Sequence, residues 1–239
     1  MEITPIEAAK KFINMTFPNC SAAFLAASAK KGSIKKNSDL DLVIFDDSFD
    51  IHFRKVYDFE PWPVEAFGFN IDSFDHFLNE NSVFALPTIA RICTKGMLVC
   101  DKGNAQCIID MCSKNLEEGP PSWSFDDLNF ARFEITDQLE DLITSQNMME
   151  NYFIVNKLFT LCATYILRVN DLWLGDGKWL YRELRNFDDE VTNNFMSAFE
   201  SYYKSNDKEP IIHFVDSILK PFGGRLFVGF YQEEIKDKD

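Results

Sequence analysis

A break near the middle of the chain constrains the fold more than any other feature. Residues 117–122 read EEGPPS, and Gly-Pro-Pro interrupts any regular helix or strand. Before the break, short apolar runs alternate with segments of helical spacing. Beyond it, strand signals nearly vanish and helical spacing continues to residue 219. We therefore predict an α+β chain, with a small mixed-sheet domain over residues 1–118 and an all-α helical bundle over residues 119–239.

The spacing of apolar residues also predicts the individual elements. A weak strand or a loop is expected over residues 51–57, and Ser73 is the candidate N-cap of the helix that follows residues 64–69. The first domain is expected to contain strands over residues 21–27, 39–45, 64–69 and 97–100, and helices over 5–14, 73–80, 87–94 and 105–115. The second domain is expected to contain helices over residues 125–144, 150–169, 178–187, 191–204 and 210–219.

Composition and charge limit the class of protein. A hydrophobic fraction of 46% with 24 Phe is ample for a core, which argues against a disordered chain. The net charge of −14 repels nucleic acid, whose binding depends on neutralised phosphates, and favours cationic small molecules or basic proteins as partners. Because the N-terminus lacks an apolar signal region and no apolar run approaches ~18 residues, we expect a soluble cytoplasmic protein with no membrane partner.

Cysteine and histidine usage excludes two further kinds of site. The 6 cysteines include no Cys-x-x-Cys pair and sit mostly among apolar neighbours, which is typical of buried thiols in a reducing compartment. The histidines His52, His76 and His213 show no metal-binding spacing. We therefore expect neither a disulfide framework nor a zinc site.

Two acids, Asp39 and Asp41, lie in the apolar run of residues 39–45. In a strand both side chains point to one face of the sheet, and Leu40, Leu42 and Ile44 point to the other. Neighbouring carboxylates repel each other, and their burial is costly unless a cation pairs with them. An edge strand with a solvated polar face explains Asp-x-Asp on its own, but the residues upstream favour a site for divalent metal ions.

Those upstream residues complete a longer pattern. Ala27-Ser28 follows an apolar strand, and ten residues separate Ser28 from Asp39. This arrangement resembles the nucleotidyltransferase superfamily that shares its palm-like fold with DNA polymerase beta. The signature of that family is a strand, Gly-Ser, a short loop and Asp-x-Asp on the next strand. Ala27 departs from the signature, because Gly permits a close approach of the backbone to the nucleotide phosphates.

The resemblance implies further site residues. Small bacterial members carry Arg-Gly in the loop, where this chain has Lys31-Gly32; Lys31 keeps the charge but loses the bidentate fork of Arg. The superfamily also has a third acid on a following strand, and Glu65 fits that place. Asp39, Asp41 and Glu65 would then hold two Mg²⁺ ions, while Ser28 and Lys31 would bind the phosphates of an NTP.

The helical half resembles antibiotic-modifying nucleotidyltransferases in architecture, which implies that it binds the acceptor. A helical-domain carboxylate acts as general base in those relatives, and Asp137 or Asp141 fits this role; a solvated acidic face, shared with Glu134, explains the same residues. Lys178 follows Gly-Asp-Gly and would bring an amine to the triphosphate. The alternative is a helix–helix turn with Asp176 or Gly177 as N-cap and the nearby tryptophans in the core.

The resemblance implies an enzyme that moves a nucleoside monophosphate, with AMP from ATP as the first expectation, to a hydroxyl of a small molecule. The acidic charge fits a cationic acceptor such as an aminoglycoside and disfavours nucleic acid. One alternative is an antitoxin-like protein adenylyltransferase. Another is a catalytically weak nucleotide-binding or scaffold protein, which Ala27 would suit. The sequence leaves monomer and homodimer equally open.

Overall fold

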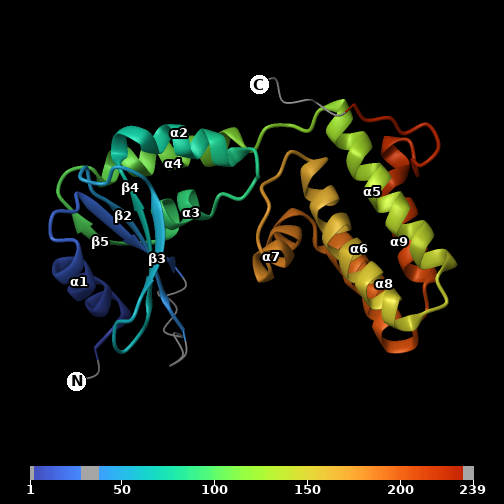
Figure 1. Cartoon of the computed structure of the whole chain (residues 1–239), viewed down its shortest axis with the longest axis horizontal. Coiled ribbons are helices and arrows are strands. Elements are labelled where there is room, and N and C mark those ends of the chain that lie inside the picture. The colour runs from blue at the N-terminus through green and yellow to red at the C-terminus, as the bar shows by residue number, and fades with distance from the viewer. Residues whose placement is uncertain (1–2, 28–37, 234–239) are drawn as a thin grey trace. The chain divides into compact units, whose positions relative to one another are not determined.

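The chain divides into two compact units, Met1–Pro120 and Pro121–Asp239. A computed structural model describes residues 3–27 and 38–233 (Figure 1). The first unit is built on a mixed sheet and the second consists of helices, so the α+β prediction is confirmed. No helix in the described part of the chain combines the length and the apolar character that a membrane crossing needs.

The sheet of the first unit has the strand order β3-β4-β2-β1-β5. The central strand β2 pairs in parallel with β4 and antiparallel with β1, and the outer strands β5 and β3 pair antiparallel with β1 and β4. The edge strand β3 occupies the segment that the sequence left open between strand and loop. The strands are β1 (Ala22–Leu25), β2 (Leu40–Phe45), β3 (Phe53–Tyr57), β4 (Val64–Phe69) and β5 (Met97–Asp101).

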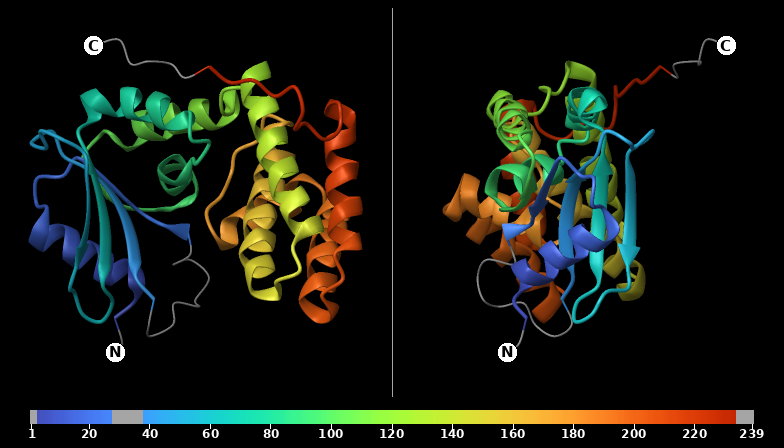
Figure 2. Two further views of the ribbon diagram at one scale, coloured as in Figure 1. Left: turned by 45° about the vertical axis from the view of Figure 1, so that its right-hand side comes forward. Right: turned by 90° about the vertical axis from the view of Figure 1, so that its left-hand side faces the viewer.

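Helices cover both faces of this sheet. Helix α1 packs against one face, where Leu40, Leu42 and Ile44 are buried as the alternation predicts. In the right-hand view of Figure 2, α1 crosses the sheet on the side turned to the viewer. Helices α2, α3 and α4 pack against the other face, over Val43 and Phe45. The helices are α1 (Pro5–Thr16), α2 (Ile71–Ser82), α3 (Thr88–Lys95) and α4 (Ala105–Glu118).

Polar side chains set the starts of several helices. Helix α1 begins with a capping box, in which Thr4 and Glu7 each accept from the other's backbone N–H. Helix α2 begins at Ile71, earlier than predicted, because Asn70 is its N-cap and accepts from the backbone N–H of Asp72 at 2.9 Å. The assignment of Ser73 as this N-cap was therefore wrong.

The second unit is a helical bundle around its own core. Helix α6 is its most buried element, with Leu158, Cys162 and Leu167 fully enclosed. Beyond α9 and a short 3₁₀ turn (Lys220–Phe222), Phe227 and Phe230 stack on Phe133 of α5. Its helices are α5 (Phe125–Thr144), α6 (Met148–Arg168), α7 (Lys178–Phe187), α8 (Asp189–Ser205) and α9 (Glu209–Leu219).

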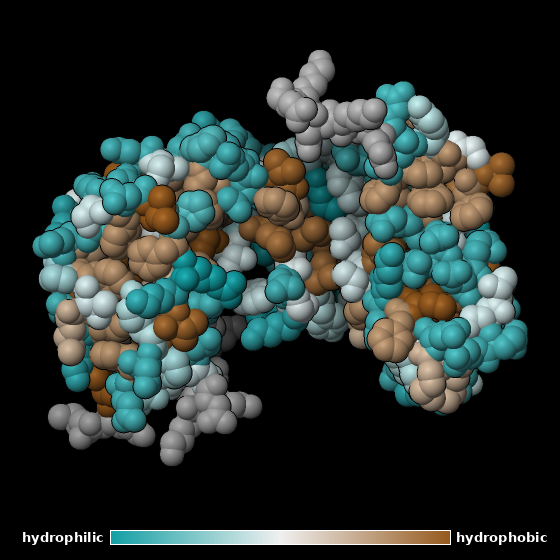
Figure 3. All heavy atoms as spheres, viewed as in Figure 1, coloured by the Kyte–Doolittle hydropathy of each residue, from teal (hydrophilic) through white to brown (hydrophobic). Residues whose placement is uncertain are grey.

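The outer surface agrees with the acidic composition. In Figure 3, hydrophilic side chains cover most of the visible face of each unit, and apolar side chains form separate patches among them. Most of the charge is therefore solvated, and what distinguishes one group of acids from another is how the backbone brings them together.

Candidate active site

The register between β2 and β4 places two of the predicted acids side by side. The strands pair in parallel with Asp41 directly opposite Glu65. Neighbouring strands lie about 4.8 Å apart, and paired residues point to the same face. Asp39 lies two residues before Asp41, just ahead of the strand, where the backbone N–H of Leu40 donates to the carbonyl of Pro63 at 2.9 Å. The three acids therefore share one end and one face of the sheet.

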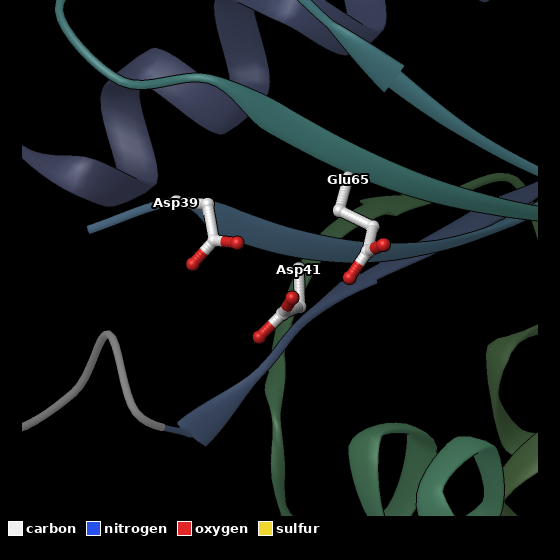
Figure 4. Close-up of side chains that lie close together, drawn as sticks. All are labelled: Asp39, Asp41 and Glu65. Carbon is white, nitrogen blue, oxygen red and sulfur yellow. The ribbon is translucent and has the colours of Figure 1, made fainter. Parts of the chain in front are cut away.

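Their carboxylates converge on a common point (Figure 4). One oxygen from each of Asp39, Asp41 and Glu65 lies within 4.8 Å of the others. Asp39 is exposed, whereas Asp41 and Glu65 are half-buried. Farther along the same face the side chains become apolar and enter the core beneath helices α2, α3 and α4. The carboxylates therefore sit on a rigid, well-packed support but remain open to solvent on one side.

This donor set fits magnesium. Mg²⁺ binds oxygen ligands at 2.0–2.1 Å, so two oxygens on one ion lie at most about 4.2 Å apart. The separations here come within a small side-chain rotation of that value. All three ligands are carboxylates, the type that Mg²⁺ prefers, and within the described residues no other group of three His, Cys, Asp or Glu residues converges this closely.

The end of β1 lies beside the acids. Leu25 pairs with Leu42, and the backbone N–H of Ala26 donates to the carbonyl of Asp41 at 2.9 Å. The chain therefore leaves β1 at Ala27 next to the acidic cluster, which is where the sequence pattern requires it to leave. Ser28 and Lys31, the predicted phosphate ligands, lie outside the described residues.

Arg54 on β3 is part of this site, and the sequence analysis missed it. Its Nε donates to Oε1 of Glu65 at 2.7 Å, although 69% of the Arg54 side chain is exposed and only 15% of Glu65. The hydrogen bond to Glu65 and the charge of Glu65 raise the pKa of Arg54, and the charge of Asp41 adds to this. Only a β3–β4 hairpin with its register, Arg54 opposite Phe67, would have placed Arg54 on the acidic face.

The other predicted acids lie on α5 of the second unit. Asp137 is half-buried and Asp141 is exposed, and Nε2 of Gln138 donates to Asp137 at 3.4 Å. Glu134, on the same face, is 3.7 Å from Nζ of Lys157 on α6. A surface of partly paired acids is what the alternative interpretation expects, and the general-base role of Asp137 or Asp141 stays a prediction.

Lys178 is the exposed first residue of α7. Gly177 is the N-cap, with a φ of 52° that glycine tolerates easily, and the backbone N–H of Trp179 donates to the carbonyl of Asp176 at 3.0 Å. Trp179 is 44% exposed and carries the guanidinium of Arg182 at 4.3 Å from its ring centroid. The turn alternative is therefore correct for Gly177 and wrong in placing Trp179 in the core. The phosphate-binding role of Lys178 stays a prediction.

Comparisons with known proteins add little to the geometry of the site. No protein-family model matches the sequence, and no curated protein matches it. Among solved structures, one similar chain is described as a nucleotidyltransferase-like protein from Exiguobacterium sibiricum. The two are 10% identical, the alignment covers 90% of this chain and 74% of that chain, and the TM-score is 0.49. A likeness this low carries no argument about the acids. Their assignment as a candidate metal site rests on their own geometry.

Proposed function

We propose that this chain is a metal-dependent nucleotidyltransferase that moves a nucleoside monophosphate, AMP from ATP, to a hydroxyl of a small molecule. The observation that carries the proposal is the convergence of Asp39, Asp41 and Glu65 within 4.8 Å on a parallel strand pair. Three carboxylates held this close attract further positive charge beyond the guanidinium of Arg54, and the transfer of a phosphoryl-type group needs its charge neutralised at a fixed place.

The reaction forms one bond and breaks another at the α-phosphorus of the nucleotide. The acceptor oxygen bonds to that phosphorus, the bond to the bridging oxygen of the β-phosphate breaks, and pyrophosphate leaves. Magnesium, when bound, supplies charge neutralisation of the triphosphate and a lowered pKa of the acceptor hydroxyl. Asp39, Asp41 and Glu65 would hold the ions, and Glu65 would share the ion that lowers the pKa of the acceptor hydroxyl.

The remaining roles rest on the family resemblance. Ser28 and Lys31 bind the terminal phosphates, and Lys178 adds positive charge there. Asp137 or Asp141 accepts the proton of the acceptor hydroxyl as general base. The net charge of −14 favours a cationic acceptor of the aminoglycoside type. The helical unit is proposed to bind this acceptor.

Labelled ATP, Mg²⁺ and a panel of aminohydroxyl compounds test the proposal. Replacing the metal ligands with Asp39→Asn/Asp41→Asn is expected to lower pyrophosphate release by at least ~10³-fold. Asp47→Asn/Asp50→Asn is the matched control, because it removes two exposed acids from the same unit and changes the net charge equally.

Each outcome separates the alternatives. Pyrophosphate release that survives in the metal-ligand variant would overturn the assignment of the site. Label on protein instead of a small molecule would favour the protein adenylyltransferase. No ATP binding by the unmodified chain, measured by calorimetry, would favour the scaffold interpretation.

A further inference from the structure

Arg54 shares a face of the sheet with the acids because of the β3–β4 register. These strands pair antiparallel, with Arg54 opposite Phe67 and Val56 opposite Glu65. Residues two apart on a strand point to the same side, so Arg54 is the diagonal neighbour of Glu65, a distance that a long side chain spans. Glu65 is in turn the direct partner of Asp41. The fold thus places a cationic side chain on the same face of the sheet as the candidate metal ligands, beside Glu65.

Two contacts, with Glu65 and with Phe67, restrain the side chain of Arg54 on this face of the sheet. Its Nε lies 2.7 Å from Oε1 of Glu65, and its guanidinium carbon lies 5.3 Å from the ring centroid of Phe67. Stacking on an aromatic face restrains a guanidinium, and the hydrogen bond aims it at the carboxylate. The carboxylate of Glu65 lies beside those of Asp39 and Asp41 (Figure 4), and the same carboxylate bonds to the guanidinium of Arg54.

We propose that Arg54 is a resident counter-ion of the candidate metal centre that competes with a divalent ion for Glu65, so that the full set of ions binds only together with the triphosphate. This inference rests on the proposed function of the same site. A fixed guanidinium repels a divalent ion with twice the energy it exerts on a monovalent one, and it occupies one oxygen of Glu65. The negative charge of a nucleotide triphosphate offsets that repulsion and tips the competition toward the metal.

A purely orienting role for Arg54 predicts the opposite effect of its removal. If Arg54 served only to fix the rotamer of Glu65, a neutral replacement would loosen the ligand and weaken metal binding. If Arg54 competes with the metal, the same replacement frees Glu65, removes the repulsion and tightens metal binding. The sign of the change in affinity therefore decides between the two roles.

The experiment is a titration of the full chain with Mn²⁺ in the absence of nucleotide, followed by electron paramagnetic resonance of the free ion. Arg54→Gln is expected to bind Mn²⁺ roughly three- to tenfold tighter, where tenfold corresponds to about 1.4 kcal/mol. Lys55→Gln is the matched control. It removes one charge from the adjacent residue, which faces the other side of β3 opposite Ala66, and it should change the affinity less than about twofold.

Two more variants test the pairing with Glu65. Arg54→Lys keeps the charge without the planar fork and should give an affinity between those of the unmodified chain and Arg54→Gln. In a Glu65→Gln background, Arg54→Gln should lose most of its gain, because the competition is for that carboxylate. The far-ultraviolet circular dichroism of all variants should match the unmodified chain, since the Arg54 side chain is largely exposed.

The possible failures are distinct. Unchanged or weaker Mn²⁺ binding by Arg54→Gln, with tight binding by the unmodified chain that Asp39→Asn/Asp41→Asn abolishes, would overturn the role of Arg54 and leave the metal centre intact. No Mn²⁺ binding by any of these proteins, in the absence of ATP and again in its presence, would overturn the metal centre and this inference together. An equal gain in Lys55→Gln would show a general charge effect and would also overturn the inference.

Discussion

The sheet and helix α5 both carry groups of acids, but the two groups are built differently. On the sheet, one oxygen from each of Asp39, Asp41 and Glu65 lies within 4.8 Å of the others. On α5, two glutamates have basic partners on other segments: Glu134 lies 3.7 Å from Lys157, and Glu140 lies 2.8 Å from Arg225. The acids of the sheet are concentrated at one point, where Arg54 pairs with Glu65, whereas these two glutamates of α5 lie in separate ion pairs.

Backbone geometry explains the difference. Paired strands fix their residues at a spacing of about 4.8 Å, and the apolar residues beneath prevent the strands from moving apart to relieve the repulsion. On a helix, acids three or four residues apart diverge into solvent, where water and surface lysines screen them. Of these two groups, packing energy therefore maintains a concentration of charge on the sheet, and a metal ion requires such a concentration.

The largest expected effect tests whether the acids of α5 take part in catalysis at all. If one of them is the general base, Asp137→Asn or Asp141→Asn should lower kcat by about 10²–10⁴-fold. Mn²⁺ affinity should stay unchanged in both variants, because neither residue belongs to the acidic cluster of the sheet. The measurement is steady-state transfer from labelled ATP beside the Mn²⁺ titration.

Glu134→Gln is the control for this pair, because it removes a charge from the same helix face and disrupts only a partly exposed ion pair. If neither aspartate variant slows transfer more than this control, the acids of α5 are a solvated surface and the general-base proposal is wrong. The acids of the sheet would then be the group with a proposed role in catalysis, and the acids of α5 would have none.

The next largest effect tests whether the packing of each unit acts on its own acids alone. Phe45 is fully buried beneath α2, 4.7 Å from Phe74 between ring centroids, and Phe45→Ala should cost about 3–5 kcal/mol of stability in the first unit. It should also loosen β2 and weaken Mn²⁺ binding. Leu158→Ala in the core of the second unit should cost about 2–5 kcal/mol there and leave Mn²⁺ binding unchanged.

Thiol labelling reports on the two units separately. Cys112 is buried in the core beneath α2, and Cys162 is buried in the helical core, where burial raises the pKa of its thiol. Phe45→Ala should speed the native-state labelling of Cys112, and Leu158→Ala that of Cys162. Exposed Cys107 should react fast in every variant and serves as internal control. Equal acceleration of both buried thiols by either variant would show that the units unfold together.

The sequence predicted the parts of the fold in which a local pattern is strong. Helix α5, helix α7 and strand β4 have the predicted bounds, because continuous helical spacing or an apolar run ended by clear breaks defines them. The edge strand β3 was left open, since it is paired on one side only and its residues Arg54, Lys55 and Val56 are exposed. A strand with few buried residues needs little alternation of apolar and polar residues, so its sequence predicts it only weakly.

The candidate site was predictable to the same extent. Asp39 and Asp41 follow from their spacing within one strand, and the family resemblance implied Glu65 as the third acid. The contact of Arg54 with Glu65 depends on the register of β3 against β4, a non-local property that the spacing of residues along the chain does not encode. The partners of the α5 acids likewise come from other segments: Lys157 from α6 and Arg225 from beyond α9.

The smallest effect compares the two arginines that serve these groups of acids. Arg225 donates through Nε and Nη2 to Asp216 at 2.7 and 2.9 Å and through Nη1 to Glu140, and it is 30% exposed. The hydrogen bond to Asp216 leads the interactions that raise the pKa of Arg225. Arg225→Gln should lower the free energy of unfolding by about 1–2 kcal/mol, a value reduced for the partial exposure of both acids.

Arg54→Gln should lower the free energy of unfolding by less than ~1 kcal/mol, because this arginine is mostly exposed and its hydrogen bond to Glu65 competes with water. Urea unfolding at low and at high salt measures both, and the Arg225 effect should shrink as salt rises. A larger loss for Arg54→Gln than for Arg225→Gln would contradict the comparison. It would mean that Arg54 stabilises the sheet as Arg225 stabilises the bundle. The main role of its contact with Glu65 would then be to stabilise the fold and not to control metal binding.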